Sequence, residues 1–252
     1  MVSGLPTDPN ARSWIAFLGL ASALCAIAAL AASVVGYRLA WWPVRTALGI
    51  SEYAAYAAAL GLVLSLVGLL MALRRRAGRG VVAGLVGLIA ALPLVVLAVQ
   101  WNYAARSYPP INDITTDTED PPIFWDMPNP TEYPGGETAA LQGAAYPDLQ
   151  PLALEVAPER AFALALALAR DSGWEIVTEA PDEGRIEAVS TTLFYGFKDE
   201  VVIRIEPAGS GAMVDLRSRS RIGRSDLGAN AARIRAFLAE LRERAAGEAQ
   251  QR

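Results

Sequence analysis

Residues 212–222 read AMVDLRSRSRI, a run in which small or apolar side chains alternate with charged ones. A period of two residues is typical of a β-strand with one face toward a core. One face should carry the small and apolar members, which are Val214, Leu216, Ser218, Ser220 and Ile222. The other face should carry Met213, Asp215, Arg217, Arg219 and Arg221. The alternation predicts a sheet with one apolar face under helices and a row of guanidinium groups on the other.

The neighbouring segments predict the rest of this sheet. Strand patterns occur at 151–156, 174–179, 184–193 and 201–206. Turns rich in Pro and Gly separate the later strands, at 181–184 and 207–211, as expected for hairpins. Together with 212–222 these strands predict an antiparallel sheet of four to five strands.

Two helices are predicted beside the sheet. Pro158 suits the first position of a helix that runs to Asp171, and Gly173 suits its end. A second helix should start at Ser225 or Asp226, which are good N-caps. Its apolar stripe consists of Leu227, Ala231, Ile234, Leu238 and Leu241. We therefore expect an α/β (α+β) domain with both helices on one face of the sheet.

Three apolar runs precede this domain, at 14–35, 53–73 and 81–99. Each has about the length that a hydrocarbon core of roughly 30 Å requires. The first run could also be a cleaved signal peptide, with Ala29-Leu30-Ala31 as a small-x-small site. It is too long for a typical signal core, so we expect a retained anchor of three transmembrane helices.

The distribution of arginine predicts the orientation of this anchor. Arg74, Arg75, Arg76 and Arg79 crowd the short loop between the second and third runs. Cytoplasmic loops carry such an excess, so we place this loop and the N-terminus, with Arg12, in the cytoplasm. The loop at 36–52 and everything after residue 99 would then be extracytoplasmic. We expect a bacterial inner-membrane protein with a periplasmic C-terminal domain.

Charge divides the 252 residues, whose net charge is −4, into three pieces. Residues 1–103 hold seven arginines against two acids, whereas 104–150 hold eight acids against Arg106 alone. Nine of the sixteen prolines fall in 104–151, which favours an extended segment. The predicted organisation is a transmembrane region at 1–103, an acidic Pro-rich segment at 104–150 and the α/β domain at 151–252.

Missing residue types exclude much catalytic chemistry. The chain contains no histidine and one cysteine, which rules out Ser-His-Asp triads, Cys-His pairs and His-ligated zinc. The only lysine, Lys198, is followed by two acids, which raise its basicity rather than lower it. We therefore expect no enzyme, no cofactor and no metal site. The alternative is an envelope enzyme acting on lipid or glycan through Lys198 or acidic residues such as Asp215 and Glu187.

The arginine row is the sharpest functional hypothesis. Arginine forks match phosphate and carboxylate oxygens in pairs of hydrogen bonds. The candidate anion or partner surface consists of Arg217, Arg219, Arg221, Arg224, Ser225, Asp226 and Asn230. Two other interpretations remain open. The arginines could pair across strands with Glu187, Glu206 or Asp215 on a solvated face, or the acidic segment could fold over them.

Five stretches carry a resemblance to a known family: PPINDITTD at 109–117, TTLFYGFKD at 191–199, VVIR at 201–204, DLRSRSRIGRSDLGAN at 215–230 and RIR at 233–235. They resemble the bacterial and plastid family known as the domain of unknown function numbered 1499. The resemblance spans roughly 105–242. It implies an envelope domain often carried behind a few membrane helices, with the Pro-rich stretch as part of the domain, and it implies no activity.

The predicted function is a binding or scaffolding module in cell-envelope maintenance or complex assembly. Its partners would be the lipid bilayer and an envelope protein, anionic lipid or glycan. Nucleic acid is not expected, because the domain lies outside the cytoplasm and residues 151–252 carry sixteen acids against fourteen basic residues.

Overall fold

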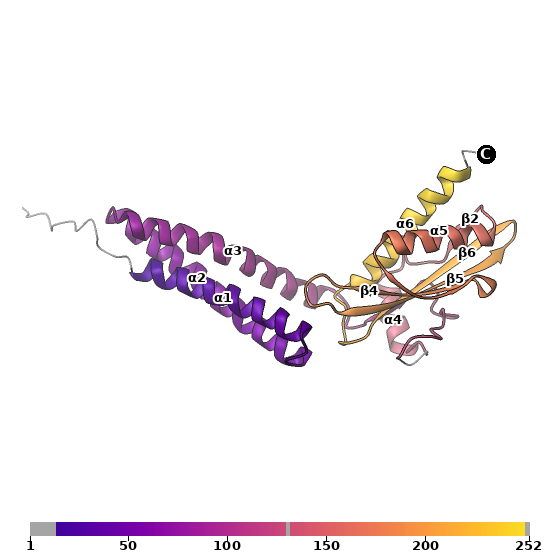
Figure 1. Cartoon of the computed structure of the whole chain (residues 1–252), viewed down its shortest axis with the longest axis horizontal. Helices are drawn as coiled ribbons and strands as arrows, with labels where there is room; N and C mark the ends of the chain where they lie inside the picture. Colours follow the sequence, from indigo (N-terminus) through magenta and orange to yellow (C-terminus); the bar gives the residue numbers. More distant parts are fainter. Residues whose placement is uncertain (1–13, 130–131, 250–252) are drawn as a thin grey trace, which may run out of the picture. The chain divides into compact units, whose positions relative to one another are not determined.

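The computed structural model describes residues 14–129 and 132–249 and divides the chain into two compact units (Figure 1). The first unit is Met1–Tyr103 and the second is Ala104–Arg252. The acidic Pro-rich stretch therefore belongs to the same compact unit as the sheet. It contributes a short strand and a helix to that unit.

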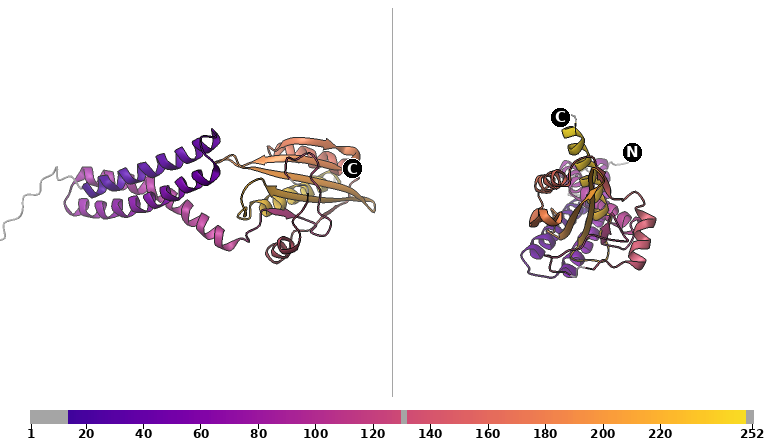
Figure 2. Two further views of the ribbon diagram at one scale, coloured as in Figure 1. Left: turned by 90° about the horizontal axis from the view of Figure 1, so that it is seen from below. Right: turned by 90° about the vertical axis from the view of Figure 1, so that its right-hand side faces the viewer.

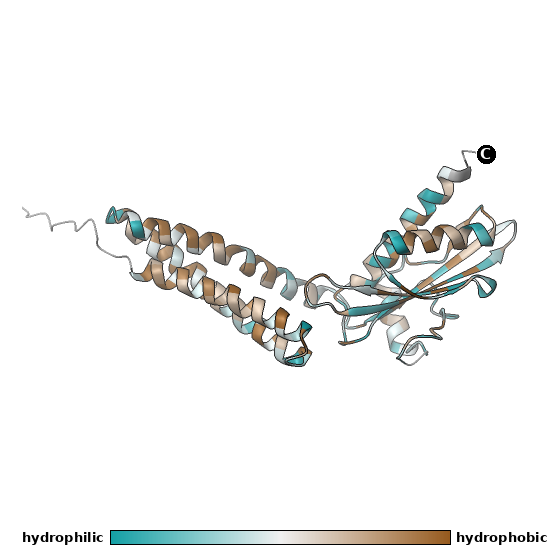
Figure 3. Cartoon of the chain, in the orientation of Figure 1, coloured by the Kyte–Doolittle hydropathy of each residue, from teal (hydrophilic) through white to brown (hydrophobic). Residues whose placement is uncertain are grey.

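The first unit contains three long helices, α1 (Trp14–Arg38), α2 (Val44–Arg74) and α3 (Gly78–Ser107). All three are long and apolar enough to cross a membrane, and hydrophobic residues dominate their ribbons in Figure 3. The predicted three-helix anchor is thus supported. Helix α2 starts nine residues before the predicted apolar run, directly after Pro43, which shortens the expected loop at 36–52. Residues 1–13, with Arg12, lie outside the described residues.

Small residues let these helices approach one another closely. A Cβ atom built on Gly19 of α1 would lie 2.4 Å from the backbone nitrogen of Ser65 in α2. On α3, a Cβ atom at Gly87 would lie 2.2 Å from the Oγ of the same Ser65. Small side chains at such contacts are how membrane helices gain packing contacts without a hydrophobic driving force.

The second unit is built on one antiparallel sheet in the order β1-β6-β5-β4-β3. A further strand, β2, pairs with the same edge of β6 as β1 does. The strands are β1 (Asp113–Thr115), β2 (Leu152–Leu154), β3 (Glu175–Ala180), β4 (Arg185–Thr191), β5 (Lys198–Ala208) and β6 (Gly211–Ser220). The helices are α4 (Gly136–Ala145), α5 (Pro158–Asp171) and α6 (Ala229–Ala249), with a 3₁₀ turn η1 (Pro181–Glu183).

Local sequence signals placed most of these elements correctly. Helix α5 has both predicted ends, whereas α6 begins three to four residues later than predicted. The reason for the delay is backbone conformation: Leu227 and Gly228 have positive φ angles of 54° and 83°, so no helix can pass through them. Asp226 still acts as a cap, because its carboxylate accepts the N–H groups of Gly228 and Asn230.

One face of the sheet carries the apolar core. Helices α5 and α6 pack on this face against β5 and β6. The buried strand residues there include Ile186, Val201, Ile203, Val214 and Leu216. The predicted antiparallel sheet with two helices on one face is confirmed.

The second face is covered as well, which the sequence left open. Residues 116–129, here called the cover segment, follow β1 and run across the strands (Figure 2). Phe124 and Met127 of this segment form a small buried cluster with Val189 and Val202. The expectation of an exposed arginine row is therefore wrong for Arg217 and Arg219, which are buried. Of the interpretations kept open, folding of the acidic segment over the arginines is the one the structure has.

Candidate functional site

Arg217, the first arginine of the predicted row, is completely buried. Its Nε and Nη2 donate to the two carboxylate oxygens of Asp113 at 2.9 and 2.8 Å. The remaining donors reach the carbonyl oxygens of Pro122 and Glu132 at 3.0 and 3.1 Å. The guanidinium carbon also lies 4.9 Å from the ring centre of Phe124. At least four of the five N–H donors of this guanidinium are thus bonded within the domain, which gives Arg217 a structural role.

Arg219 and Arg221 share one carboxylate. Glu200 is fully buried, and its two oxygens accept from the Nε of Arg219 and the Nε of Arg221, both at 2.8 Å. The partners expected from the sequence were Glu187, Glu206 and Asp215, and Glu200 was not among them. Glu200 lies directly opposite Arg219 in the β5–β6 register, which a single sequence does not reveal. Arg221 keeps 27% of its side chain exposed, and Arg224 is exposed.

The acids proposed for an enzyme are also engaged. Glu187 pairs with Arg185 and accepts the backbone N–H of Trp125 at 2.7 Å. Asp215 accepts from Thr116 Oγ1 at 2.9 Å and from an Nη of Arg204 at 3.1 Å. Lys198 is about half exposed, with its Nζ 3.9 Å from a carboxylate oxygen of Glu175. These contacts bring none of the three side chains together.

Ser225, Asp226 and Asn230 fasten the start of α6 to the chain that leaves α3. The Nδ2 of Asn230, a fully buried residue, donates to the carbonyl oxygen of Asn112 at 3.0 Å. Ser225 Oγ donates to the carbonyl oxygen of Pro109 at 3.3 Å. Burial raises the pKa of the Asp226 carboxyl above its ordinary value, although hydrogen bonds from backbone N–H groups, chiefly those of Gly228 and Asn230, oppose that shift. Ser225, Asp226 and Asn230 therefore have a structural role in the domain, which accounts for their place in the stretch 215–230.

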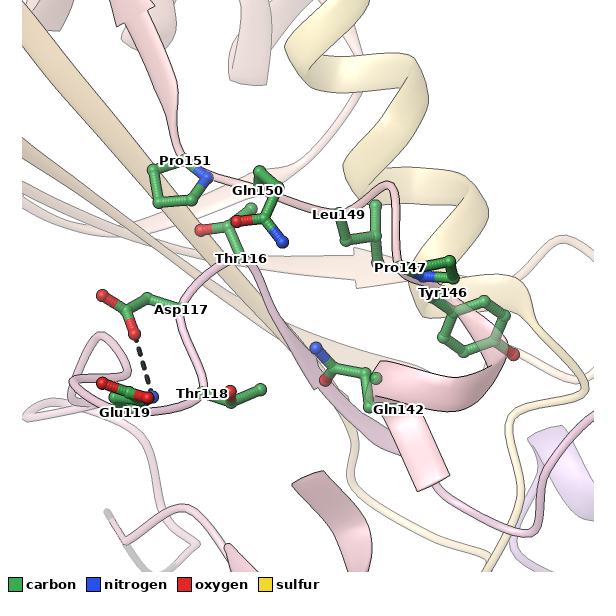
Figure 4. Close-up of a pocket in the computed structure, with 11 residues that line it drawn as sticks. Thr116, Asp117, Thr118, Glu119, Gln142, Tyr146, Pro147, Leu149, Gln150 and Pro151 are labelled. Atoms are coloured by element: carbon green, nitrogen blue, oxygen red, sulfur yellow. Dashed lines mark hydrogen bonds between the residues drawn. The ribbon is translucent and has the colours of Figure 1, made fainter. Parts of the chain in front are cut away.

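A groove of about 470 Å³ lies beside the gap between β1 and β2 (Figure 4). Both strands pair with β6, β1 at residues 217–219 and β2 at residues 212–214, so a short stretch of β6 lies between them. The lining residues are Thr116, Asp117, Thr118, Glu119, Gln142, Gly143, Tyr146, Pro147, Leu149, Gln150 and Pro151. This site was not predicted from the sequence, because its two walls are more than twenty residues apart in the chain.

The inner groups of the groove hold it in shape. Gln142 is buried, and its amide accepts from Thr115 N at 3.0 Å and donates to Thr115 O at 2.7 Å. This side chain therefore pairs with the outer edge of β1 as another strand would. At the rim, Asp117 accepts the N–H of Glu119 at 2.9 Å, as drawn in Figure 4, which closes a tight turn.

The chemistry of the groove suits hydrogen bonding more than catalysis. Its ionisable rim groups are Asp117 and Glu119, and Gln150 on the opposite wall is exposed. Tyr146 is 4% exposed, and among the described residues its hydroxyl has no hydrogen-bond partner. Burial raises the pKa of this phenol to about 12, so it stays protonated near neutral pH. In the part of the chain that the structure describes, no group of three or more Cys, Asp or Glu residues is placed to hold a metal ion.

Comparison with known proteins gave one family. The family model described as "Protein of unknown function (DUF1499)" matches residues 113–241. The match begins at the first residue of β1 and ends within α6, so it includes the cover segment, the groove and the whole sheet. No curated protein matches the chain.

Proposed function

Since the chain belongs to the DUF1499 family of proteins of unknown function, we propose a role that rests on its architecture and not on an established activity. The proposed role is that of a membrane-anchored, non-catalytic binding module. Its domain would lie in the periplasm of a bacterium and serve cell-envelope maintenance or complex assembly.

The proposed orientation rests on charge and aromatic residues. Arg74, Arg75 and Arg76 lie at and just after the end of α2, and Arg79 lies in the first turn of α3. This loop would be cytoplasmic, which places the N-terminus inside and the α/β domain outside. Trp101 and Tyr103, near the other end of α3, are exposed and suit the outer interface of the bilayer.

The groove of Figure 4 carries the binding proposal. The buried cations of the sheet are paired with carboxylates inside the domain, which leaves few interior groups for a ligand. The groove combines a rigid floor with exposed polar rims at Glu119 and Gln150. Because its ionisable rim groups are acidic, we propose that it takes a neutral or cationic segment of an envelope protein.

The enzymatic alternative would need an activated nucleophile or base. Lys198 has the carboxylate of Glu175 nearby, and Asp215 and Glu187 are each paired with an arginine. General acid–base chemistry needs such groups within hydrogen-bond reach of one reacting centre, whereas these side chains are engaged in separate ion pairs. These contacts support a binding role.

Crosslinking in native membranes tests the proposal. A photoreactive amino acid would replace Thr118 or Gln150 at the groove, or Asp182 in the exposed turn beside the β3 edge as the matched control. We expect one adduct of defined mass from both groove positions and none from position 182. The absence of an adduct at the groove, or the same adduct from all three positions, would contradict the groove as the binding site.

A fusion experiment tests the topology separately. A reporter that is active only outside the cytoplasm, joined to the C-terminus, should be active in the full chain. Activity only from a cytoplasmic reporter at the same position would contradict the proposed orientation.

A further inference from the structure

The turn between β4 and β5 lies at the end of the domain where the chain arrives from α3. Asn112 accepts the N–H of Ser220 at 2.9 Å, so the arriving chain lies against the last residue of β6. At the same end, the N–H of Arg221 bonds to the carbonyl oxygen of Lys198, the first residue of β5. Residues 192–197, here called the hairpin tip, immediately precede Lys198. The tip is therefore beside the membrane attachment of the domain.

The attachment at this end is tight. The ring of Tyr108 lies so close to Gly228 that a Cβ atom there would be 2.6 Å from a ring carbon. Asp226 N–H bonds to the carbonyl oxygen of Ile111 at 3.1 Å. Eight helical residues, 100–107, lie between Val99, the end of the strongly apolar run, and Tyr108. At about 1.5 Å per helical residue, this tether is roughly 15 Å long at most.

The hairpin tip presents apolar side chains at its surface. Leu193 is 83% exposed and Phe194 is 66% exposed. Large exposed apolar side chains at one point of a surface mark interaction sites with proteins or membranes. The tip is also stiff, because Tyr195 and Phe197 stack at 5.0 Å and Thr192 forms hydrogen bonds with Phe197 and Gly196. Its apolar residues are therefore presented in a fixed shape.

Cationic side chains surround this apolar tip. Lys198 and Arg224 are exposed, and Arg221 is partly exposed. Arg106 adds a further exposed cation in the last turn of α3. One neighbouring acid, Glu175, is exposed and lies 3.9 Å from Lys198. The other two are used inside the domain: Asp199 pairs with Arg233, and Glu200 is fully buried between two arginines. The end of the domain next to the tether is therefore basic although residues 104–252 are acidic overall.

We propose that the hairpin tip docks on the bilayer surface, with Leu193 and Phe194 among the lipid headgroups and Lys198, Arg221 and Arg224 on anionic lipid phosphates. The combination of an apolar wedge with basic flanks is what interfacial membrane anchors use. The short tether supplies the proximity, and the stiff hairpin lowers the cost of ordering. Such docking fixes the tilt of the domain and the direction in which its groove faces.

Depth-dependent quenching in nanodiscs tests this docking with the full chain. Cys25 would be changed to Ala, and an environment-sensitive fluorophore would be attached to Phe194→Cys. The matched control is Ser210→Cys in the exposed turn between β5 and β6, at the far end of the eleven-residue strand β5. In nanodiscs that contain phosphatidylglycerol, lipids with a quencher near the headgroup should quench position 194 at least about twofold more than position 210.

A charge variant tests the lipid specificity. Changing Lys198 and Arg224 together to Gln should remove most of the difference between anionic and neutral nanodiscs, and added salt should do the same in the unchanged chain. Absence of quenching at position 194 would overturn the docking. A blue shift without lipid quenching would overturn it too, since the tip would then pack on protein. The role of anionic phosphates would be overturned if quenching at position 194 were the same in anionic and neutral nanodiscs and were unchanged by the two glutamine substitutions.

This test is independent of the groove. The nanodisc contains only lipid and this chain, so its outcome does not depend on whether a partner protein binds beside β1. Conversely, failure of crosslinking at Thr118 and Gln150 leaves the quenching result intact.

Discussion

The two faces of the sheet are both buried, but by different interactions. On the helix face, Val201, Ile203 and Leu216 meet the apolar sides of α5 and α6. On the covered face, Arg217, Arg219 and Glu200 are each at most 6% exposed. They lie under the cover segment, which has no regular helix or strand. Burial on the first face follows directly from removal of apolar surface from water. On the second face each buried charge requires a partner, because an unpaired ion is very costly to desolvate.

The comparison teaches where the specificity of the domain lies. Apolar side chains accept many neighbours of suitable size, whereas Arg217 accepts only carboxylate and carbonyl oxygens in fixed directions. Its partners come from Asp113, Pro122 and Glu132, so one side chain holds β1 and two points of the following chain together. Our hypothesis is that the charged face determines which segment covers the sheet, more than it determines stability.

The largest loss of stability should come from breaking the ion pair between Asp113 and Arg217 on the covered face. Asp113→Ala leaves the buried guanidinium of Arg217 without its carboxylate. Loss of one partner from a buried ion pair costs about 3–5 kcal/mol. Hydrogen exchange of the β5 and β6 amides in the full chain should therefore show a drop in protection of that size.

A double variant separates specificity from stability. Asp113→Leu with Arg217→Met removes both charges, and we expect it to regain most of the protection. Recovery should be incomplete, because the carbonyl oxygens of Pro122 and Glu132 lose their donor. If the double variant were as unstable as Asp113→Ala, the pair would contribute more to stability than our hypothesis allows.

The next effect compares one residue type on the two faces. Val201 and Val202 are adjacent on β5, both at most 1% exposed, and they point to opposite sides. Val201→Ala should cost about 2 kcal/mol, since it removes two buried methyl groups and leaves a cavity between the sheet and its helices. Val202→Ala should cost about 1 kcal/mol, since the irregular cover segment can settle into the space.

The same hydrogen-exchange measurement decides this pair. Equal losses at positions 201 and 202 would indicate that the cover segment is packed as rigidly as the helices. A larger loss of protection in Val202→Ala than in Val201→Ala would indicate that the covered face is the more tightly packed of the two.

The smallest effect concerns two aspartates with opposite pKa shifts. Hydrogen bonds from Arg185, and then from Thr178, lower the pKa of the Asp126 carboxyl in the cover segment. Burial raises the pKa of the Asp226 carboxyl at the start of α6. Stability contributed by Asp126 is present above its unfolded pKa and is lost as pH falls through the folded pKa. Stability contributed by Asp226 is present below its unfolded pKa and is lost as pH rises through the folded pKa.

Melting temperatures between pH 3 and pH 7 check these signs. Asp126→Asn should reduce the fall in melting temperature as pH is lowered toward 3. Asp226→Asn should reduce the fall in melting temperature as pH is raised toward 7. The two variants therefore serve as controls for each other. Changes in the same direction for both would contradict the assigned causes.

The sequence predicted the architecture well where a local period controls it. Long uncharged runs predicted three candidate membrane helices, and the alternation at 212–222 predicted the two faces of β6. The boundaries of α5 followed from Pro158 and Gly173, both local signals. The start of α6 was predicted too early, because a hydrophobic pattern does not show that Leu227 and Gly228 have positive φ angles.

The candidate site was much harder to predict from residue types. Six of the seven predicted site residues are held in contacts inside the domain, namely Arg217, Arg219, Arg221, Ser225, Asp226 and Asn230. The groove was missed because Thr116 and Gln150 meet only after β1 and β2 have paired with the same strand.

By itself the sequence determined which side chains share a face, because strand and helix periods are properties of neighbouring residues. Only the tertiary structure decided what covers each face. Asp113 and Arg217 are 104 residues apart, and Glu200 becomes the partner of Arg219 only through the β5–β6 register. The physical reason is that a row of charged side chains is stable either when it is exposed to water or when it is buried against oppositely charged partners. The sequence of the strand is the same in both cases, so it does not tell them apart.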